Sequence, residues 1–268
     1  DAFGNLITIL DAADAGTVDD VETRISYTGE DPACRASHIV GVANGVEVQA
    51  GDHTMRRRDA VVDCETGNIT RYRALLADGS AAQSDLTYQA DGNLQSFTGP
   101  VNHRGQRFKL TYEYDEVVAT HVTSVTDSFG YRSRMTYDLR YGLPQDTIDI
   151  NNQEMRFRYD AVGRLDTVTG PYEIAGTRPT IDFEYHPEAA VPFAVTRHVD
   201  RQADGTLRAD TIDTITFVDG LQRVLQIKKD ASLFTGPDKP PAAEMIVSGR
   251  LVFDFLGRTV QQFYPTSE

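Results

Sequence analysis

The chain has 268 residues, of which 40% are hydrophobic and 25% charged, a composition typical of folded globular proteins that can bury a core. It has 40 acidic and 26 basic residues, and the net charge of -14 argues against binding to nucleic acid or to anionic lipid. No stretch approaches the roughly 18 consecutive apolar residues of a membrane span, so none is expected.

The N-terminal part, residues 1–60, has the least regular pattern. Residues 1–5 (Asp-Ala-Phe-Gly-Asn) match part of a motif that is fuller later, so we expect the chain to be a piece of a larger protein. From about Asp11 to Asp31 acids are frequent and large apolar residues rare, which predicts an exposed loop or an irregular edge. Cys34 and Cys64 are compatible with a disulfide or with two buried free thiols.

Alternation of apolar and polar residues is the main secondary-structure signal. It is clearest in residues 108–115, 155–160 and 181–186. Because successive side chains of a strand point to opposite faces, these segments are expected to be strands with one buried and one wet face. No amphipathic helix of ten residues or more is evident, so antiparallel hairpins are the natural interpretation.

An internal repeat accompanies this alternation. Residues 88–100 align with residues 159–171 without gaps, and seven of the thirteen positions are identical. Weaker copies lie at residues 1–5, 127–131 and 253–258. The residues that carry the motif are Tyr88, Gly92, Asp127, Gly130, Tyr159, Asp160, Gly163, Arg164, Asp219, Arg223, Phe253, Asp254, Gly257 and Arg258.

Turn chemistry explains the spacing within each copy. An aromatic residue ends one strand, Asp follows at the first turn position in the fullest copies, and Gly comes three residues later. The Asp side chain can accept from the backbone of its own turn, and Gly can adopt the positive φ needed where the turn re-enters the ladder through a bulge. Asn151-Asn152 predicts a further hairpin turn, and residues 234–241 a loop. Neither irregular stretch looks like a linker, so residues 1–268 are expected to form one continuous region, with repeats from 61 to 268.

The segment Tyr-Asp-Ala-Val-Gly-Arg-Leu, residues 159–165, resembles the YD or RHS repeat, whose core is Tyr-Asp-x-x-Gly-Arg-Leu. Residues 253–258 fit with Phe replacing Tyr. Residues 217–224 resemble a variant of the repeat, but Gln222 stands at a glycine position and would be strained at positive φ. Residues 226–230 and 245–250 look particularly like the B component of insecticidal toxin complexes.

The resemblance implies an all-β ribbon of antiparallel β-hairpin (YD/RHS) repeats that forms an arc of a hollow shell. In the toxins of this family the shell encloses a cytotoxic polypeptide for delivery. The resemblance therefore implies a structural segment of a secreted bacterial protein, whose partners are the remainder of its own shell and the enclosed polypeptide. An extracellular location would also favour a disulfide between Cys34 and Cys64.

No motif for catalysis, cofactor binding or metal binding is found, so we expect neither enzyme activity nor a cofactor. The Asp-Pro-x-Gly-type motif of the self-cleaving RHS core is absent as well, since Asp31-Pro32 is followed by Ala33-Cys34. Two other function classes remain. A carbohydrate or cell-surface binding module would place tyrosines on an exposed groove. A β-sandwich hydrolase would need a cleft with perturbed carboxylates.

Overall fold

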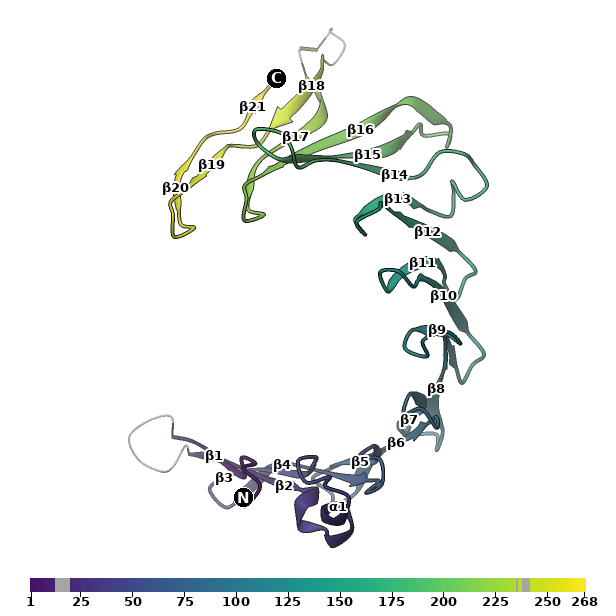
Figure 1. The fold of residues 1–268 in the computed structure, drawn as a ribbon, viewed down its shortest axis with the longest axis vertical. Helices are drawn as coiled ribbons and strands as arrows, with labels where there is room; N and C mark the ends of the chain where they lie inside the picture. The colour runs from purple at the N-terminus through teal and green to yellow at the C-terminus, as the bar shows by residue number, and fades with distance from the viewer. Residues whose placement is uncertain (13–19, 235, 238–241) are drawn as a thin grey trace. The chain divides into compact units, whose positions relative to one another are not determined.

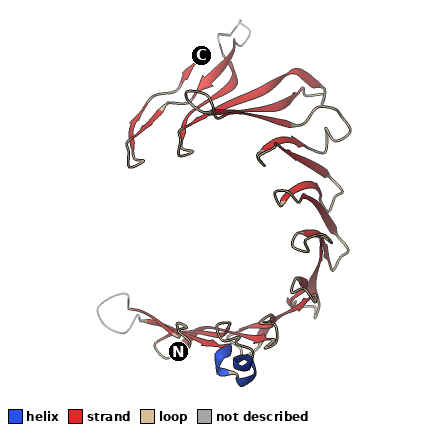
Figure 2. Ribbon diagram, in the orientation of Figure 1, coloured by secondary structure: helices blue, strands red, loops and turns tan. Residues whose placement is uncertain are grey.

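The protein folds almost entirely into β-strands in the computed structural model, which describes residues 1–12, 20–234, 236–237 and 242–268 (Figure 2). Its contacts divide into two compact units, residues 1–135 (unit 1) and residues 136–268 (unit 2). No helix in the described ranges has the length and apolar character needed to cross a membrane.

Unit 1 is a run of antiparallel strands in which each strand pairs with the next one along the chain (Figure 1). Its strands are β1 (Thr8–Asp11), β2 (Val21–Tyr27), β3 (Ala43–Ala50), β4 (His53–Val62), β5 (Ile69–Leu75), β6 (Ala81–Tyr88), β7 (Leu94–Val101), β8 (Arg107–Tyr114), β9 (Val122–Asp127) and the start of β10 (Arg132–Asp138).

Unit 2 continues the same pattern from β11 to β18. Its strands are β11 (Leu143–Ile148), β12 (Glu154–Tyr159), β13 (Leu165–Thr169), β14 (Ile181–His186), β15 (Phe193–Arg201), β16 (Leu207–Val218), β17 (Val224–Leu233), β18 (Ala242–Val247), β19 (Leu251–Phe253), β20 (Thr259–Gln262) and β21 (Thr266–Ser267). The short strand β21 pairs with β18, whereas β19 and β20 form a separate hairpin.

The three strands predicted from alternation are confirmed as β8, β12 and β14. The expectation that each buries one face is wrong, because their apolar faces are only partly covered. Within the described ranges the buried apolar side chains are those of Cys34, Val168, Val195 and Val247. The accessible surface is 17971 Å², against roughly 11,600 Å² for a compact protein of this mass. Each strand is bordered by other strands within the sheet, but few residues from a second layer cover its faces.

The expectation of an exposed loop or an irregular edge from Asp11 to Asp31 is wrong for residues 21–27. Strand β2 occupies residues 21–27, where Val21, Thr23 and Ile25 alternate with polar residues and the strand pairs with both β1 and β3. The density of acids hid this alternation. Residues 13–19 of the expected loop lie outside the described residues, as do residue 235 and residues 238–241 of the loop expected at 234–241.

A helical insertion, residues 28–42, joins β2 to β3 (Figure 2). It holds a single 3-10 turn, η1 (Thr28–Glu30), and one short helix, α1 (Pro32–Ala36). The side chain of Asp31 caps α1 by accepting from the N–H of Ala33 at 2.8 Å. Cys34 in α1 is joined by a disulfide to Cys64, in the connection between β4 and β5.

The connection between β13 and β14 buries a carboxylate. Glu173 is only 5% exposed, and it accepts from the Thr180 hydroxyl at 2.5 Å and from the guanidinium of Arg201. Burial by itself raises the pKa of Glu173, but Thr180 and Arg201 together hold that pKa below its ordinary value. The ion pair thus joins a buried carboxylate to a guanidinium that is 34% exposed, so the loss of Arg201 would leave a buried charge without its partner.

Candidate functional site

The fullest copy of the repeat closes the turn between β12 and β13. The N–H of Asp160 donates to the carbonyl of Arg164 at 2.9 Å, and the N–H of Gly163 donates to the carbonyl of Asp160 at 3.1 Å. One carboxylate oxygen of Asp160 accepts from the N–H groups of Val162 and Arg164, both at 2.9 Å. The other accepts from the Arg164 guanidinium at 2.7 Å. Gly163 has φ +84°, and a bulge shifts the ladder just before the turn.

Asp219 and Asp254 build the same turn in unit 2. Each accepts from the N–H groups two and four residues on, at 2.8–3.0 Å, and pairs with the guanidinium of Arg223 or Arg258. Several hydrogen bonds hold the pKa of Asp254 below its ordinary value, and the bond from the N–H of Arg258 has the largest effect. Asp127 makes only the backbone contacts, because Tyr131 stands where the other copies have arginine. The motif residues therefore stabilise turns, and their carboxylates are occupied within the chain.

Gln222 takes the left-handed conformation that Gly163 and Gly257 take in their turns. Its φ is +61°, and its N–H donates to the carbonyl of Asp219 at 3.1 Å as the glycine N–H does elsewhere. The turn thus keeps its hydrogen bonds despite the strain expected of a side chain at positive φ.

We therefore expect Gln222→Gly to raise the free energy of unfolding by about 1 kcal/mol, because glycine removes the left-handed strain. Urea unfolding followed by circular dichroism measures the change. Gln226→Gly, in the regular strand β17, is the matched control and should be destabilising by a similar amount. A loss of stability in Gln222→Gly would contradict the strain.

The copy that follows Tyr88 differs at its first turn position, where Gln89 replaces Asp. Asp91 stabilises this turn instead, by accepting from the N–H of Asn93 at 3.0 Å. The same contact, to a Ser or Thr N–H, recurs at Asp78 and Asp204. All three turns read Ala-Asp-Gly followed by a small polar residue, and the sequence analysis did not recognise this second class.

Four tyrosines in the strands of the sheet are anchored by their hydroxyl groups. Tyr159, at the end of β12, donates to the carbonyl of Pro144 in β11 at 2.7 Å. Equivalent bonds of 2.8–3.0 Å join Tyr88 to Ile69, Tyr114 to Leu94 and Tyr185 to Leu165. Burial raises the pKa of each of these four tyrosines. The aromatic residue of the repeat therefore ties one strand to the start of the strand before it.

The motif arginines connect successive repeats. The guanidinium of Arg164, which pairs with Asp160, lies 4.4 Å from the ring centroid of Tyr185. Arg223 likewise pairs with Asp219 and lies 4.5 Å from the ring of Phe253, the aromatic residue of the next copy. Such cation–π contacts contribute about 0.5–1 kcal/mol each at partly exposed sites.

Two further turns begin with a Tyr-Asp pair that the sequence analysis missed. Asp138 follows Tyr137, and its main-chain carbonyl accepts from the N–H of Gly142, four residues on. The carboxylate of Asp138 pairs with Arg140 at 2.6 Å. After Tyr114, Asp115 accepts from five consecutive N–H groups, residues 117–121, which hold its pKa well below its ordinary value. A search for Tyr-Asp with a variable distance to the turn end would have found both.

One group of potential metal ligands occurs within the described ranges, formed by Asp31, Cys34 and Cys64. The two sulfur atoms are bonded to each other, and the carboxylate of Asp31 caps α1. These donors are therefore already used in holding the helical insertion.

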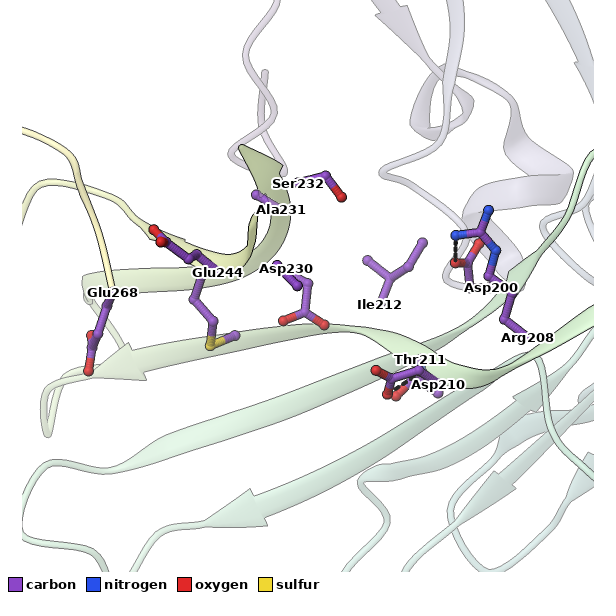
Figure 3. A pocket seen from close by; sticks show the side chains of 12 residues that line it. Asp200, Arg208, Asp210, Thr211, Ile212, Asp230, Ala231, Ser232, Glu244 and Glu268 are labelled. Atoms are coloured by element: carbon purple, nitrogen blue, oxygen red, sulfur yellow. Dashed lines mark hydrogen bonds and ion pairs between the residues drawn. The ribbon is translucent and has the colours of Figure 1, made fainter. Parts of the chain in front are cut away.

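A groove of about 580 Å³ lies in unit 2 over β16, β17 and β18 (Figure 3). Its acidic lining residues are Asp200, Asp210, Asp230, Glu244 and Glu268. Asp200 pairs with Arg208 at 3.1 Å, Asp230 accepts from a main-chain N–H at 2.8 Å, and Glu268 pairs with Lys228. Its lining includes neither histidine nor cysteine.

No family model matches the sequence, and no curated protein matches it either. Solved structures do match the fold. The structure of TcdB2-TccC3 superposes with a TM-score of 0.67 at 13% identity, over 98% of this chain and 20% of that chain. The structure of TcdB2-TccC3-Cdc42 superposes with a TM-score of 0.67 at 11% identity. The structure of TcdB2-TccC3 without its hypervariable C-terminal region superposes with a TM-score of 0.66 at 12% identity. Each of these two matches covers 92% of this chain and 20% of the other chain. The chain thus spans about a fifth of the length of the solved chains it matches, and it has the antiparallel hairpin fold of these toxin-complex structures.

Proposed function

We propose that residues 1–268 form a continuous stretch of wall in a secreted bacterial toxin shell of the RHS type, without a catalytic role. Its partners are then the remainder of the shell and the cytotoxic polypeptide enclosed in it. The observation that carries the proposal is the match in fold to TcdB2-TccC3, which extends over nearly the whole chain at a TM-score of 0.67.

The way in which the strands are held together also supports a role as a wall. A wall must stay ordered while both of its faces remain accessible, so it cannot rely on a thick apolar core. Here the turns are closed by their own Asp and Arg side chains, and tyrosine hydroxyls tie strands to the main chain of their neighbours. These interactions lie within the plane of the sheet or at its turns, where covering by a second layer is not required.

The placement of the tyrosines favours the wall over the carbohydrate-binding alternative. The hydroxyls of Tyr88, Tyr114, Tyr159 and Tyr185 already donate to main-chain carbonyls, so they are not free to bind a sugar. Several tyrosines are exposed, and among them Tyr264, which is 95% exposed, lies beside Phe263 in a groove of about 300 Å³ that has room for a sugar ring to stack. Binding on a glycan array that is lost in Tyr264→Ala would favour the alternative.

Small-angle X-ray scattering of the chain tests the wall directly. A compact protein of 268 residues has a radius of gyration of roughly 18 Å. We expect a clearly larger value, measured beside a globular standard of equal mass, because a wall segment lacks a closed core. A value close to that of the standard would contradict the proposal.

Enclosure is tested with the natural full-length protein that contains this chain. Limited trypsin digestion of the intact shell should leave the enclosed polypeptide uncut, whereas digestion after unfolding in urea should degrade it. Equal digestion of the polypeptide in both conditions would argue against enclosure.

A further inference from the structure

The helical insertion 28–42 packs against the turn at the start of unit 1. The ring of Phe3 lies against Gly29, where a Cβ atom would come within 2.8 Å of it. The side-chain amide of Asn5 donates to the carbonyl of Val40 at 3.0 Å. The insertion therefore covers a turn that precedes β1, although it follows β2 in the chain.

The same insertion is attached to the connection between β4 and β5. Ile39 lies 3.6 Å from the position that a Cβ atom would have at Gly67, and the disulfide joins Cys34 to Cys64 in the same connection. The insertion thus bridges the turn at residues 1–5 and the connection at residues 63–68. Its covalent link to the second is the disulfide alone.

Apart from these contacts, the insertion has little structure of its own to keep it folded. Its helix α1 has five residues, far fewer than the roughly 12–15 at which isolated helices become even marginally stable. Its buried residues are Thr28, Gly29 and Cys34, the last of them 1% exposed. A segment with so few buried contacts opens readily once its tether is removed.

We propose that the Cys34–Cys64 disulfide is a redox-sensitive clamp. When a small thiol such as glutathione reduces it, the insertion is released from both turns, while the neighbouring strands of unit 1 stay folded. Extracellular surroundings keep the clamp closed, and a reducing compartment opens it. The clamp adds a response to redox conditions to the proposed wall and does not depend on what the wall encloses.

The reaction is an ordinary thiol–disulfide exchange. The thiolate of glutathione attacks Sγ of Cys64, because residue Cys64 is half-buried whereas residue Cys34 is only 1% exposed. A mixed disulfide forms on Cys64, the Cys34–Cys64 bond breaks, and the Cys34 sulfur leaves with the electron pair and takes a proton from water. A second glutathione thiolate attacks the mixed disulfide, which releases oxidised glutathione and, after protonation, the Cys64 thiol. Two electrons and two protons are transferred in total.

Hydrogen exchange with mass spectrometry tests the clamp on the whole chain. The reporters are the N–H groups of Arg35, Ser37 and Ile39, which donate within the insertion at 2.8–3.2 Å. With glutathione in excess we expect their protection to fall by at least about tenfold, while the neighbouring strands β2, β3, β4 and β5 keep theirs. The Cys34→Ser/Cys64→Ser double variant should show the released pattern without reductant and should not respond to it.

Two results would overturn the clamp. The first is unchanged protection of the three reporters although alkylation shows that both thiols are free. Noncovalent contacts would then hold the insertion in place without the disulfide. Loss of protection throughout unit 1 would mean that the disulfide is needed for the fold rather than for one segment.

The point of attack is tested by brief treatment with glutathione, acid quenching and peptide mass analysis. The mixed disulfide on Cys64 should exceed that on Cys34 by at least about fivefold, because access governs which sulfur is attacked. Equal amounts on the two cysteines would overturn the proposed route.

Discussion

Replacing Arg201 with alanine is expected to lower the free energy of unfolding of unit 2 by about 3 kcal/mol, because Glu173 would stay buried without its cation. The pKa of Glu173 is lowered in the folded protein, so its contribution to stability is present above its ordinary value of 4.5 and is lost as the pH falls through the lower folded value. In the variant, protonation of Glu173 removes the buried charge. The difference between the two proteins should therefore shrink as the pH is lowered from 7 to below 4.

Urea unfolding at several pH values measures this difference. Arg208→Ala is the matched control, because Arg208 makes an ion pair with Asp200 at 3.1 Å but is largely exposed. That substitution should cost less than about 1 kcal/mol. Two results would contradict this prediction. One is an equal loss of stability in both variants at pH 7. The other is an effect of Arg201→Ala that does not depend on pH.

Gly249→Ala should destabilise the C-terminal hairpin by about 2–3 kcal/mol. Gly249 follows β18 and lies directly against the main-chain carbonyl of Phe263, so a methyl group at residue 249 would collide with backbone. Relief requires the segment around Phe263 to move away. Hydrogen exchange should then show faster exchange at the N–H of Phe263, which donates to Arg250, and at the N–H of Met245, which donates to Glu268.

Gly220→Ala provides the control for this prediction. A Cβ atom at Gly220 would meet open space, and its φ is not in the left-handed region. The change should be within about 0.5 kcal/mol of neutral. An equal effect of the two substitutions would contradict the collision at Gly249, because a reduced freedom of the unfolded chain stabilises the fold.

Strands and turns with strong local signals could be predicted from the sequence. Alternation alone located β8, β12 and β14, because a strand with distinct faces repeats every two residues. The Asp and Gly of the repeat indicated the turns because their conformational requirements are local. Strand β2 has the same alternation but was obscured by neighbouring acids. The start of α1 carries a local signal, Asp31 as N-cap followed by Pro32, which the sequence analysis did not recognise because the helix has only five residues.

Interactions that join different repeats could not be predicted in this way. The ring beside Arg164 belongs to Tyr185, and the carbonyl that accepts from Tyr159 belongs to Pro144. Which residues meet depends on strand register and on the length of each connection, and these vary along the chain. The burial of Glu173 depends likewise on the irregular connection between β13 and β14, for which the repeat gives no template.

Pairing between consecutive strands has a consequence for how such a chain folds. The tyrosine hydroxyl bonds span only 15 to 20 positions, and each strand from β3 to β8 pairs with the strands immediately before and after it. Closing such short loops costs little entropy, and stability in nearest-neighbour arrays is close to a sum of local terms. Folding can therefore start at any hairpin and advance one strand at a time, so ordered strands can accumulate while the chain is still being synthesised.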